Sequence, residues 1–327
     1  MSAEPVLIAG AARSAVVPRG GAFAELEPHE LAAPVLRALL QRTRLAPSAV
    51  DAVVLGNALG AGGNPARLLA LAAGLPVGCA ALTVDTQCCA GLDALALGVG
   101  LLTSGQASVV VLGGVEAWSR APLRARRPRH PGEAPVPYER PAFAPAPWPD
   151  PDMLLSAARY AARHGHTREQ QERYALDSHA RALAHRTRLA DEMVPVVGVS
   201  HDLNPRVLSA DRAARFPVLF PPPTLGDDGL PLAPECALTA LTVSAQADGA
   251  ALVLLATAAA CARWGLRPQA LWRASASVGS DPGTPLLAAE RAATEACRRA
   301  GVSGPGALRA LELHDAFAVQ GLDFCQR

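Results

Sequence analysis

The sequence predicts an α/β protein made of two related halves with a long insertion between them. Three observations support this fold class. Short apolar runs alternate with runs of helical periodicity, and this alternation stops abruptly at residue 120. The last sixty residues repeat the order of elements found near the beginning. Strands that are apolar throughout and alternate with helices are typical of a sheet buried on both faces.

The first half supplies the clearest elements. Strands are expected at residues 5–14, 49–59, 80–86 and 107–114, and helices at 29–43, 64–74 and 91–105. The helical runs, such as "HELAAPVLRALLQRT", have apolar residues three and four positions apart, whereas the strand runs are short and continuously apolar. The same alternation of strand and helix patterns resumes in "DGAALVLLATAAACARWGL" at residues 248–266.

The insertion begins with residues 120–152, which are dense in Arg and Pro, and we expect a long irregular segment there. Residues 153–196 are expected to be helical, followed by a loop-rich stretch to about residue 238. The expected organisation is an N-terminal half (1–119 and 239–267), an inserted loop domain (120–238) and a C-terminal half (268–327).

The second half is expected to be incomplete. Residues 286–317 repeat the helix, turn and strand order of residues 31–59, which puts His314 and Asp315 opposite Gly56 and Asn57. The first half continues through two more strands, whereas the second stops at "AVQGLDFCQR". An unfinished sheet has an open edge and an apolar face, so we expect lower stability or a partner that covers that face.

Composition excludes several classes of function. Half of the 327 residues are hydrophobic and the formal net charge is +1, which predicts a globular protein without nucleic acid or membrane as its partner. Neither a targeting signal nor a membrane-spanning run is found, so a cytoplasmic location is expected. Seven cysteines without CxxC spacing predict neither a disulfide framework nor a metal site. Four of them are expected to be buried core residues: Cys79, Cys236, Cys261 and Cys297.

Two adjacent cysteines, Cys88 and Cys89, stand in "TVDTQCCAGLDALA", where an apolar run ends and a helical run begins. A thiol at a strand-to-helix junction lies against the N–H groups of a helix N-terminus, which favour the thiolate. Such a thiolate can accept an acyl group from a thioester. On this chemistry alone, a functional thiol and two merely packed cysteines remain equally open.

A family resemblance favours the functional thiol. Residues 83–122, "TVDTQCCAGLDALALGVGLLTSGQASVVVLGGVEAWSRAP", resemble the nucleophile region of the thiolases, approximately TVNxxCxSGLxA, a helix, and a GG-x-E-x-S-x-x-P turn. Other segments resemble further thiolase motifs in family order, and together they cover nearly the whole chain: residues 11–26, 50–76, 166–184, 238–255 and 311–320.

The resemblance implies a thiolase-like fold of two βαβαβ halves in an αβαβα layered arrangement with an inserted loop domain. It also implies acyl transfer between coenzyme A thioesters. Coenzyme A or acyl-CoA would then be a substrate, with no permanently bound cofactor. A homodimer or homotetramer is the assembly that it suggests.

Residue by residue, the resemblance places the nucleophile on Cys88 and leaves Cys89 facing the core. Ser244 falls on a serine that contacts the pantetheine arm of coenzyme A, and Met153 is assigned to the same coenzyme A site. His314 replaces the usual Asn of the NEAF motif, where an imidazole N–H would help to form an oxyanion hole, or it is simply a hydrogen-bonded histidine at a strand end. Three glycines match family glycines around the nucleophile: Gly91, Gly113 and Gly114.

The chain also departs from the family pattern. It lacks the GHPxGxSG motif, whose histidine activates the nucleophile, and the CxGxG motif, whose cysteine acts as acid and base. "RHPGEAP" at residues 129–135 lies outside the family order, and Cys325 lacks the glycines. Replacements stand at Asp85, Asp152 and Leu241–Thr242. The arginines of residues 120–129 either are solvated or neutralise a coenzyme A phosphate.

Three functional hypotheses follow. The first is thiolysis of 3-ketoacyl-CoA or condensation of acyl-CoA through an acyl-Cys88 enzyme, impaired by the missing loops. The second is an inactive thiolase-like subunit that binds a partner or a completing subunit. The third is a ketosynthase of the same superfamily, against which the inserted loop domain argues.

Overall fold

The computed structural model describes residues 4–60, 62–220, 224–226 and 229–327. The chain forms two compact units, each assembled from three separate stretches of sequence. Unit 1 comprises Met1–Leu123, His185–Asn204 and Ala245–Arg273. Unit 2 comprises Arg124–Ala184, Pro205–Ser244 and Ala274–Arg327. The boundaries expected from the sequence, at residues 119, 238 and 267, stay predictions.

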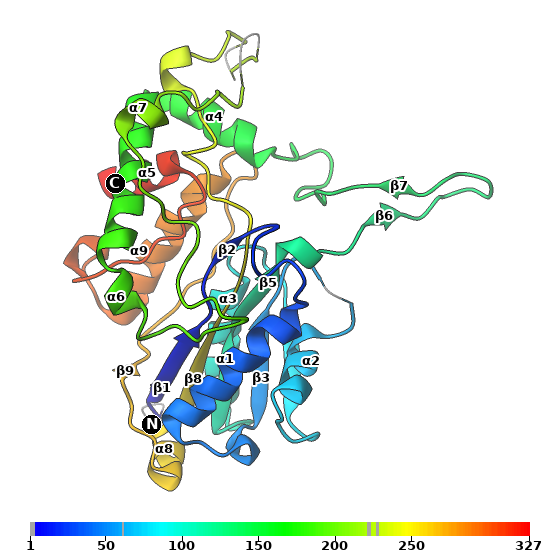
Figure 1. Ribbon diagram of the computed structural model, residues 1–327, viewed down its shortest axis with the longest axis vertical. Helices are drawn as coiled ribbons and strands as arrows, with labels where there is room; N and C mark the ends of the chain where they lie inside the picture. The colour runs from blue at the N-terminus through cyan, green and yellow to red at the C-terminus, as the bar shows by residue number, and fades with distance from the viewer. Residues whose placement is uncertain (1–3, 61, 221–223, 227–228) are drawn as a thin grey trace. The chain divides into compact units, whose positions relative to one another are not determined.

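Unit 1 is built around one mixed sheet with the strand order β4-β3-β5-β8-β1-β9, and β2 pairs with β8 (Figure 1). The strands are β1 (Val6–Arg13), β2 (Val17–Pro18), β3 (Ala52–Gly56), β4 (Ala80–Val84), β5 (Val109–Ala117), β8 (Ala247–Thr257) and β9 (Ala270–Leu271). Strand β3 is parallel to both β4 and β5, whereas β8 is antiparallel to β5 and β1. The carboxyl ends of β3, β4 and β5 therefore meet at one edge of the sheet.

Helices cover both faces of this sheet. Helices α1 (Pro28–Thr43) and α2 (Pro65–Ala72) pack on one face, and α3 (Ala90–Thr103) packs on the other (Figure 1). The short helices α6 (Arg186–Leu189) and α8 (Ala258–Trp264) also belong to unit 1. The strands and helices predicted for the first half are thus confirmed, as is the α/β fold class.

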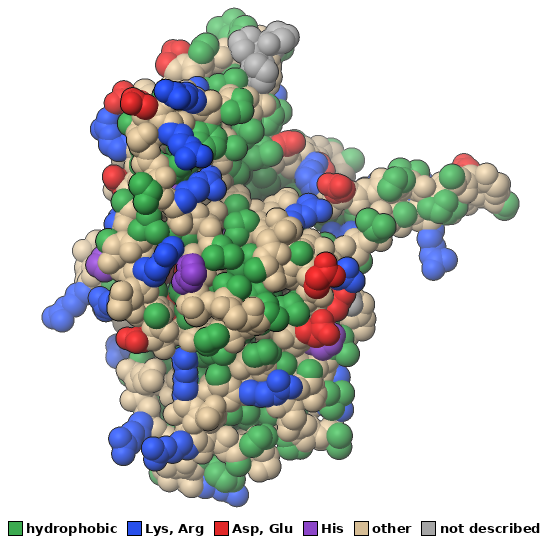
Figure 2. All heavy atoms as spheres, viewed as in Figure 1, with side chains coloured by type: hydrophobic (Ala, Val, Ile, Leu, Met, Phe, Trp, Pro, Cys, Tyr) green, Lys and Arg blue, Asp and Glu red, His purple; other side chains and the backbone are tan. Residues whose placement is uncertain are grey.

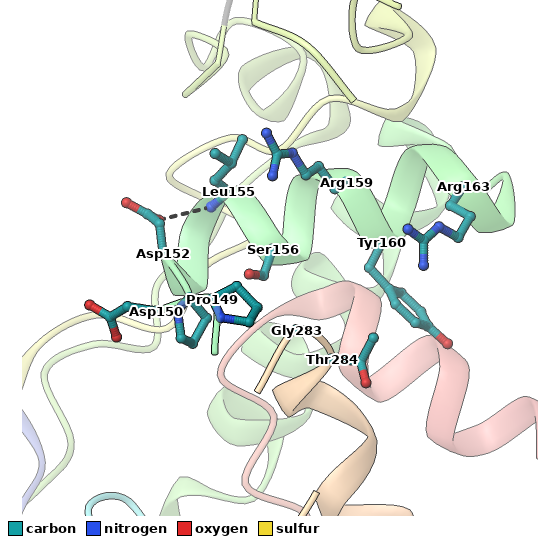
Figure 3. Close-up of a pocket in the computed structure, with 11 residues that line it drawn as sticks. Pro149, Asp150, Asp152, Leu155, Ser156, Arg159, Tyr160, Arg163, Gly283 and Thr284 are labelled. Carbon is teal, nitrogen blue, oxygen red and sulfur yellow. Dashed lines mark hydrogen bonds between the residues drawn. The ribbon is translucent and has the colours of Figure 1, made fainter. Parts of the chain in front are cut away.

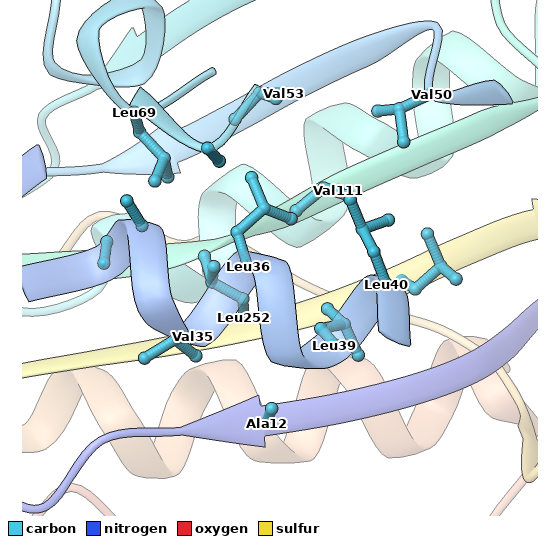
Figure 4. Close-up of a cluster of buried hydrophobic side chains, with 14 of the residues drawn as sticks. Ala12, Val35, Leu36, Leu39, Leu40, Val50, Val53, Leu69, Val111 and Leu252 are labelled. Carbon is cyan, nitrogen blue, oxygen red and sulfur yellow. The ribbon is translucent and has the colours of Figure 1, made fainter. Parts of the chain in front are cut away.

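Helix α1 shows how its sequence produces its packing. Pro28 opens the helix, and a capping box follows in which Glu30 Oε2 accepts a hydrogen bond from the backbone N–H of Glu27 at 2.9 Å. The buried face carries Leu36 and Leu39, which point at the strands beneath them (Figure 4). Burying each such leucine stabilises the fold by about 2 kcal/mol.

Strand β4 differs from its prediction. It was expected to be buried on both faces, but it is an edge strand with β3 as its hydrogen-bonded neighbour, and Leu82 is 44% exposed. Leu71 of α2 and Leu92 of α3, from the two helices that flank β4, are also exposed. The prediction of burial is wrong because an apolar run cannot distinguish a central strand from an edge strand.

The regular structure of unit 2 is mainly helical, and long irregular segments connect its helices. Its helices are α4 (Met153–His164), α5 (Arg168–Ala184), α7 (Ala210–Ala213), α9 (Ala288–Ala300) and α10 (Ala318–Gln326). The short strands β6 (Ala125–Arg126) and β7 (Val136–Pro137) pair in the otherwise irregular Pro-rich excursion. A hydrophobic cluster joins α4 to Leu286, Phe317 and Val319.

The predicted repeat in the second half is confirmed for its helix and wrong for its strand. Helix α9 occupies the expected helical position. The segment 308–315, expected to be a strand, has no sheet partner among the described residues and is irregular. A strand needs a neighbour to satisfy its backbone N–H and C=O groups, and the sequence repeat does not supply one.

On the face seen in Figure 2, arginine side chains are dispersed among acidic and hydrophobic ones. Among the described residues, no helix has both the length and the apolar content needed to cross a membrane.

Candidate active site

Cys88 lies in the short connection between β4 and α3, at the carboxyl edge of the sheet. The preceding Gln87 has φ +56°, a left-handed conformation that is uncommon for a residue with a side chain. Asp85 stabilises it, because its Oδ1 accepts hydrogen bonds from Gln87 N at 2.9 Å and from Gln87 Nε2 at 3.1 Å. This tight turn leaves the Cys88 side chain exposed. Strained turns of this kind are concentrated at functional sites.

The start of helix α3 follows directly. Cys89 is its N-cap residue, and the Cys89 carbonyl accepts the N–H groups of Leu92 and Asp93 at 2.9 and 3.0 Å. Cys88 therefore precedes the cap of a 14-residue helix, whose N-terminal dipole favours a negative charge nearby. The sequence prediction of a thiol at a strand-to-helix junction is confirmed.

The prediction that Cys89 faces the core is wrong, because its side chain is exposed. A helix N-cap lies outside the helical stripe that packs on the sheet, so its position does not follow the helical periodicity. Partial burial nevertheless raises the pKa of the Cys89 thiol, and Cys88 and Asp93 add to this rise. This rise disfavours the thiolate form of Cys89. The four cysteines expected in the core, Cys79, Cys236, Cys261 and Cys297, are all buried as predicted.

Glycines let the backbone approach closely beneath this turn. A Cβ on Gly56, at the end of β3, would lie 2.5 Å from the carbonyl carbon of Ala90 and from the N atom of Gly91. Gly113 of β5 has φ +144°, and a Cβ there would lie 2.0 Å from the carbonyl oxygen of Ala251. The first turn of α3 is therefore fixed against the end of β3 by direct backbone contact, and β5 approaches β8 equally closely at Gly113.

Buried Asn57 and half-buried Glu116 form a polar pair at the same edge, which was not expected from the sequence. Glu116 Oε1 accepts a hydrogen bond from Asn57 Nδ2 at 2.8 Å, and Glu116 Oε2 accepts the N–H groups of Ala58 and Leu59 at 2.9 and 3.3 Å. Burial raises the pKa of the Glu116 carboxyl despite these bonds, and the charge of Asp85 adds to the rise. Both residues stand at the carboxyl ends of parallel strands, and this position is the sequence feature that could have indicated the pair.

Ser244, His314 and Met153 belong to unit 2, so the structure describes them separately from Cys88 in unit 1. The backbone N–H of Ser244 donates to the carbonyl oxygen of Ala316 at 2.9 Å, two residues after His314. Met153, at the start of α4, packs in the same hydrophobic cluster as Ala316. Ser244 and His314 therefore lie on neighbouring segments of unit 2, and Met153 contacts the same hydrophobic cluster as Ala316.

The residues that depart from the thiolase pattern have structural roles. Asp152 is the N-cap of α4, and its Oδ1 accepts the N–H of Leu155 at 3.0 Å. Leu241 and Thr242 are both buried, and the Thr242 hydroxyl donates to the carbonyl oxygen of Thr239 at 3.1 Å.

Unit 2 also contains a cavity of about 310 Å³ along α4 (Figure 3). Ser156 and Thr284 bring hydroxyls to it, and Arg159 and Arg163 bring guanidinium groups. Met153, Ser244 and His314 are not among its lining residues. Within the described part of the chain, no group of three or more His, Cys, Asp or Glu side chains could hold a metal ion.

Comparison with known proteins gives consistent matches. Residues 6–259 match the family model described as "Thiolase, N-terminal domain". The chain is 34% identical to an acetyl-CoA acetyltransferase of Pseudomonas aeruginosa, over 98% of this chain and 82% of that protein. It is 35% identical to one of Rhizobium meliloti, again over 98% and 82%. It superimposes on the crystal structure of the Bacillus anthracis acetyl-CoA acetyltransferase with a TM-score of 0.83 and 27% identity, over 99% of this chain and 83% of that one.

Proposed function

This chain belongs to the thiolase family, and from that premise we propose that it transfers acyl groups between coenzyme A thioesters through an acyl-Cys88 intermediate. The observation that carries the proposal is the exposed Cys88 thiol in a strained turn before helix α3. This turn lies inside the stretch that matches the thiolase model. The related acetyl-CoA acetyltransferases support coenzyme A thioesters as the substrate class.

The acylation step forms one bond and breaks another. The Cys88 thiolate attacks the carbonyl carbon of the acyl thioester, and the resulting tetrahedral intermediate carries a negative oxygen. When this intermediate collapses, the bond to the coenzyme A sulfur breaks and coenzyme A leaves as a thiolate. That thiolate takes up the proton that Cys88 lost. In condensation the acyl group then passes to an acyl-CoA carbanion. In thiolysis the Cys88 thiolate instead attacks the 3-keto carbonyl of 3-ketoacyl-CoA, the bond between C2 and C3 breaks, and acetyl-CoA leaves as a carbanion that takes up a proton. Coenzyme A then removes the acyl group from Cys88.

The unit 2 residues are proposed to serve the substrate. His314 would donate a ring N–H to the negative oxygen, Ser244 would contact the pantetheine arm, and Met153 would belong to the same coenzyme A site. Ser244 and His314 lie on neighbouring segments of unit 2, and this neighbourhood supports the assignment because one bound substrate could reach both. The pairing of the 242–244 and 316–318 segments holds that neighbourhood together.

The second half-reaction is the more demanding step. Condensation needs a base that removes a proton from the acyl-CoA acceptor, and the usual second cysteine motif is not found in residues 1–327. We propose formation of the acyl enzyme as the step that the described residues of this chain support. Acyl-CoA and fatty acid metabolism would be the setting, in the cytoplasm, where free thiols stay reduced.

We propose that the chain assembles as a homodimer through the edge of β4. The edge has no partner strand on its outer side among the described residues, and Leu82, Leu71 and Leu92 are exposed on and around it. Two copies that add their β4 strands to each other would satisfy both edges and bury these leucines. Exposed Val136 and Trp148 in the Pro-rich excursion offer further contact for a homotetramer. Light scattering of the purified protein tests the assembly, and a stable monomer contradicts it.

Intact-protein mass spectrometry before and after addition of acetyl-CoA tests the acyl enzyme. We expect one acetyl adduct, and peptide mapping should place it on Cys88. An adduct on Cys89, or none on a folded protein, contradicts the proposal. The second of these outcomes would favour an inactive thiolase-like subunit, and co-purification of a completing chain would support that alternative.

A further inference from the structure

Tyr174 occupies an unusual place in unit 2. It lies on α5, and its hydroxyl donates a hydrogen bond to Asp315 Oδ2 at 2.7 Å. Gly321 of α10 makes room for the phenol, because a Cβ on Gly321 would lie 2.1 Å from the Tyr174 hydroxyl oxygen and 2.3 Å from Cζ. The phenol is thus wedged between a helix and the loop that precedes it, with its hydroxyl directed at the residue next to His314.

The loop around His314 is held at several points. The N–H of Asp315 donates to the carbonyl oxygen of Leu313 at 3.1 Å, which makes a three-residue turn centred on His314. The N–H of Ala316 donates to Gln320 Oε1 at 3.0 Å, and its carbonyl accepts from Ser244. These bonds fix the chain after His314, whereas the bond from Tyr174 fixes the side chain of Asp315 within the turn itself.

We propose that Tyr174 is a positioning residue for His314, acting through its hydrogen bond to Asp315. The inference rests on the proposed function, in which His314 stabilises the negative oxygen of the acylation intermediate. An oxyanion donor must be held close to its productive position, because a small displacement weakens its bond to the transition state. Anchoring Asp315 restrains the backbone of the turn from which the His314 side chain projects.

The chemistry of the pair suits a permanent anchor. Burial raises the pKa of the Tyr174 phenol, and the hydrogen bond to Asp315 and its charge raise it further. The hydroxyl therefore stays protonated at neutral pH and can donate to Asp315. If the Tyr174–Asp315 bond only attached the loop before α10 to α5, it would stabilise unit 2 without affecting the acylation rate. The acylation rate therefore distinguishes a positioning role from a purely structural one.

The test is a double-mutant cycle on the rate at which acetyl-CoA acylates Cys88, followed by quenched-flow mass spectrometry. Tyr174→Phe keeps the ring beside Gly321 and removes only the hydroxyl. We expect its maximal acylation rate to fall about tenfold, with half-saturation by acetyl-CoA unchanged. In the His314→Ala background, Tyr174→Phe should have no further effect, since the donor that it orients is gone.

The matched control is Tyr160→Phe. Tyr160 also belongs to unit 2, and its hydroxyl donates to Asp323 Oδ1 at the same distance of 2.7 Å. Tyr160→Phe should leave the acylation rate within about twofold of the unmodified chain. Should Tyr174→Phe fail to fold, Asp315→Ala tests the same link from its other end, with the same expected loss and the same dependence on His314.

Either an unchanged acylation rate in Tyr174→Phe or a full additional loss in the His314→Ala background would overturn the inference. An equal loss in the Tyr160 variant would overturn it too, because the effect would then be a general weakening of unit 2. Absence of acyl-Cys88 in the unmodified chain is a separate result, which refutes the proposed function and this inference with it.

Discussion

In unit 1 the candidate nucleophile is fixed by backbone packing, whereas in unit 2 the candidate substrate-binding residues are fixed by hydrogen bonds between irregular segments. Cys88 stands on a turn whose neighbours, Gly56 and Gly113, touch other backbone directly. His314 stands on a loop held by Tyr174, Gln320 and the backbone of residues 242–244. The first arrangement tolerates almost no added atoms, while the second depends on particular side-chain donors.

This difference suits the two roles. A nucleophile needs one fixed position against the helix N-terminus, and a regular sheet supplies it. Residues that bind a long, flexible substrate arm can be presented by loops, provided that the loops are tied down. We therefore expect substitutions in unit 1 to act on the chemistry or on the whole fold, and substitutions in unit 2 to act in smaller, separable steps.

The largest effect is expected for Cys88→Ser. A serine hydroxyl is not ionised at neutral pH and accepts an acyl group far less readily, so acyl-enzyme formation should fall by at least about 10³-fold. Mass spectrometry after incubation with acetyl-CoA measures this directly. The protein should unfold at the same temperature as the unmodified chain, because Cys88 is exposed.

Cys89→Ser is the control for that experiment. Serine is a good N-cap residue, so helix α3 should be retained, and the acylation rate should stay within about twofold. If Cys89→Ser removed the adduct and Cys88→Ser did not, the assignment of the nucleophile would be reversed.

Gly113→Ala should give the next largest effect, on stability. The added Cβ would meet the Ala251 carbonyl oxygen at 2.0 Å in a backbone conformation with φ +144°. Strand β5 or its neighbour β8 would have to move, and we expect a loss of roughly 3 kcal/mol or more in the free energy of unfolding. Urea denaturation measures it.

Gly100→Ala, in helix α3, is the matched control. Nothing lies within 4 Å of a Cβ at Gly100, and its φ is not positive. This substitution should stabilise the protein by about 0.5 to 1 kcal/mol, because alanine favours a helix interior. Equal destabilisation by both substitutions would contradict the idea that close backbone contact between β5 and β8 requires a glycine at position 113.

Ser244→Ala should have a smaller effect, confined to substrate binding. The backbone N–H that donates to Ala316 is kept, so unit 2 should be unchanged. Loss of the hydroxyl should raise the half-saturating acetyl-CoA concentration about fivefold, the cost of one hydrogen bond, with little change in the maximal rate. Ser178→Ala, at an exposed position on α5, should change neither quantity. A fall in maximal rate for Ser244→Ala would place Ser244 in the chemistry instead.

The sequence was sufficient to predict features that depend on neighbours along the chain. Helix α1, the alternation of strands and helices, and the thiol before α3 all follow from local periodicity and capping. Resemblance to the thiolases then distinguished Cys88 from Cys89, which local chemistry could not do. The acylation experiments above decide whether that distinction holds.

Features that depend on distant neighbours were not predicted. The edge position of β4 and the irregular segment before His314 are set by which strands find partners, and an apolar run does not contain that information. The Asn57–Glu116 and Tyr174–Asp315 bonds join residues about 60 and 140 positions apart, so only the folded chain brings them together.

The smallest effect is expected from Glu116→Gln. It sharpens the comparison of the two units because it tests a polar contact inside unit 1, where backbone packing fixes the nucleophile. Burial raises the pKa of the Glu116 carboxyl above its ordinary value of 4.5, so the folded chain holds this proton more tightly than the unfolded chain does. The contribution of Glu116 to stability is therefore fully present below that value and is lost as the pH rises through the raised pKa.

Glu116→Gln cannot ionise, so its unfolding free energy should not show this decline. Urea denaturation of both proteins, from below pH 4.5 upward, measures the difference between their unfolding free energies. If the unfolding free energies of the two proteins change with pH in parallel, the hydrogen bonds from Asn57, Ala58 and Leu59 fully compensate for the burial of the charge. The polar pair would then contribute the same stability at each pH, as the glycine contacts do.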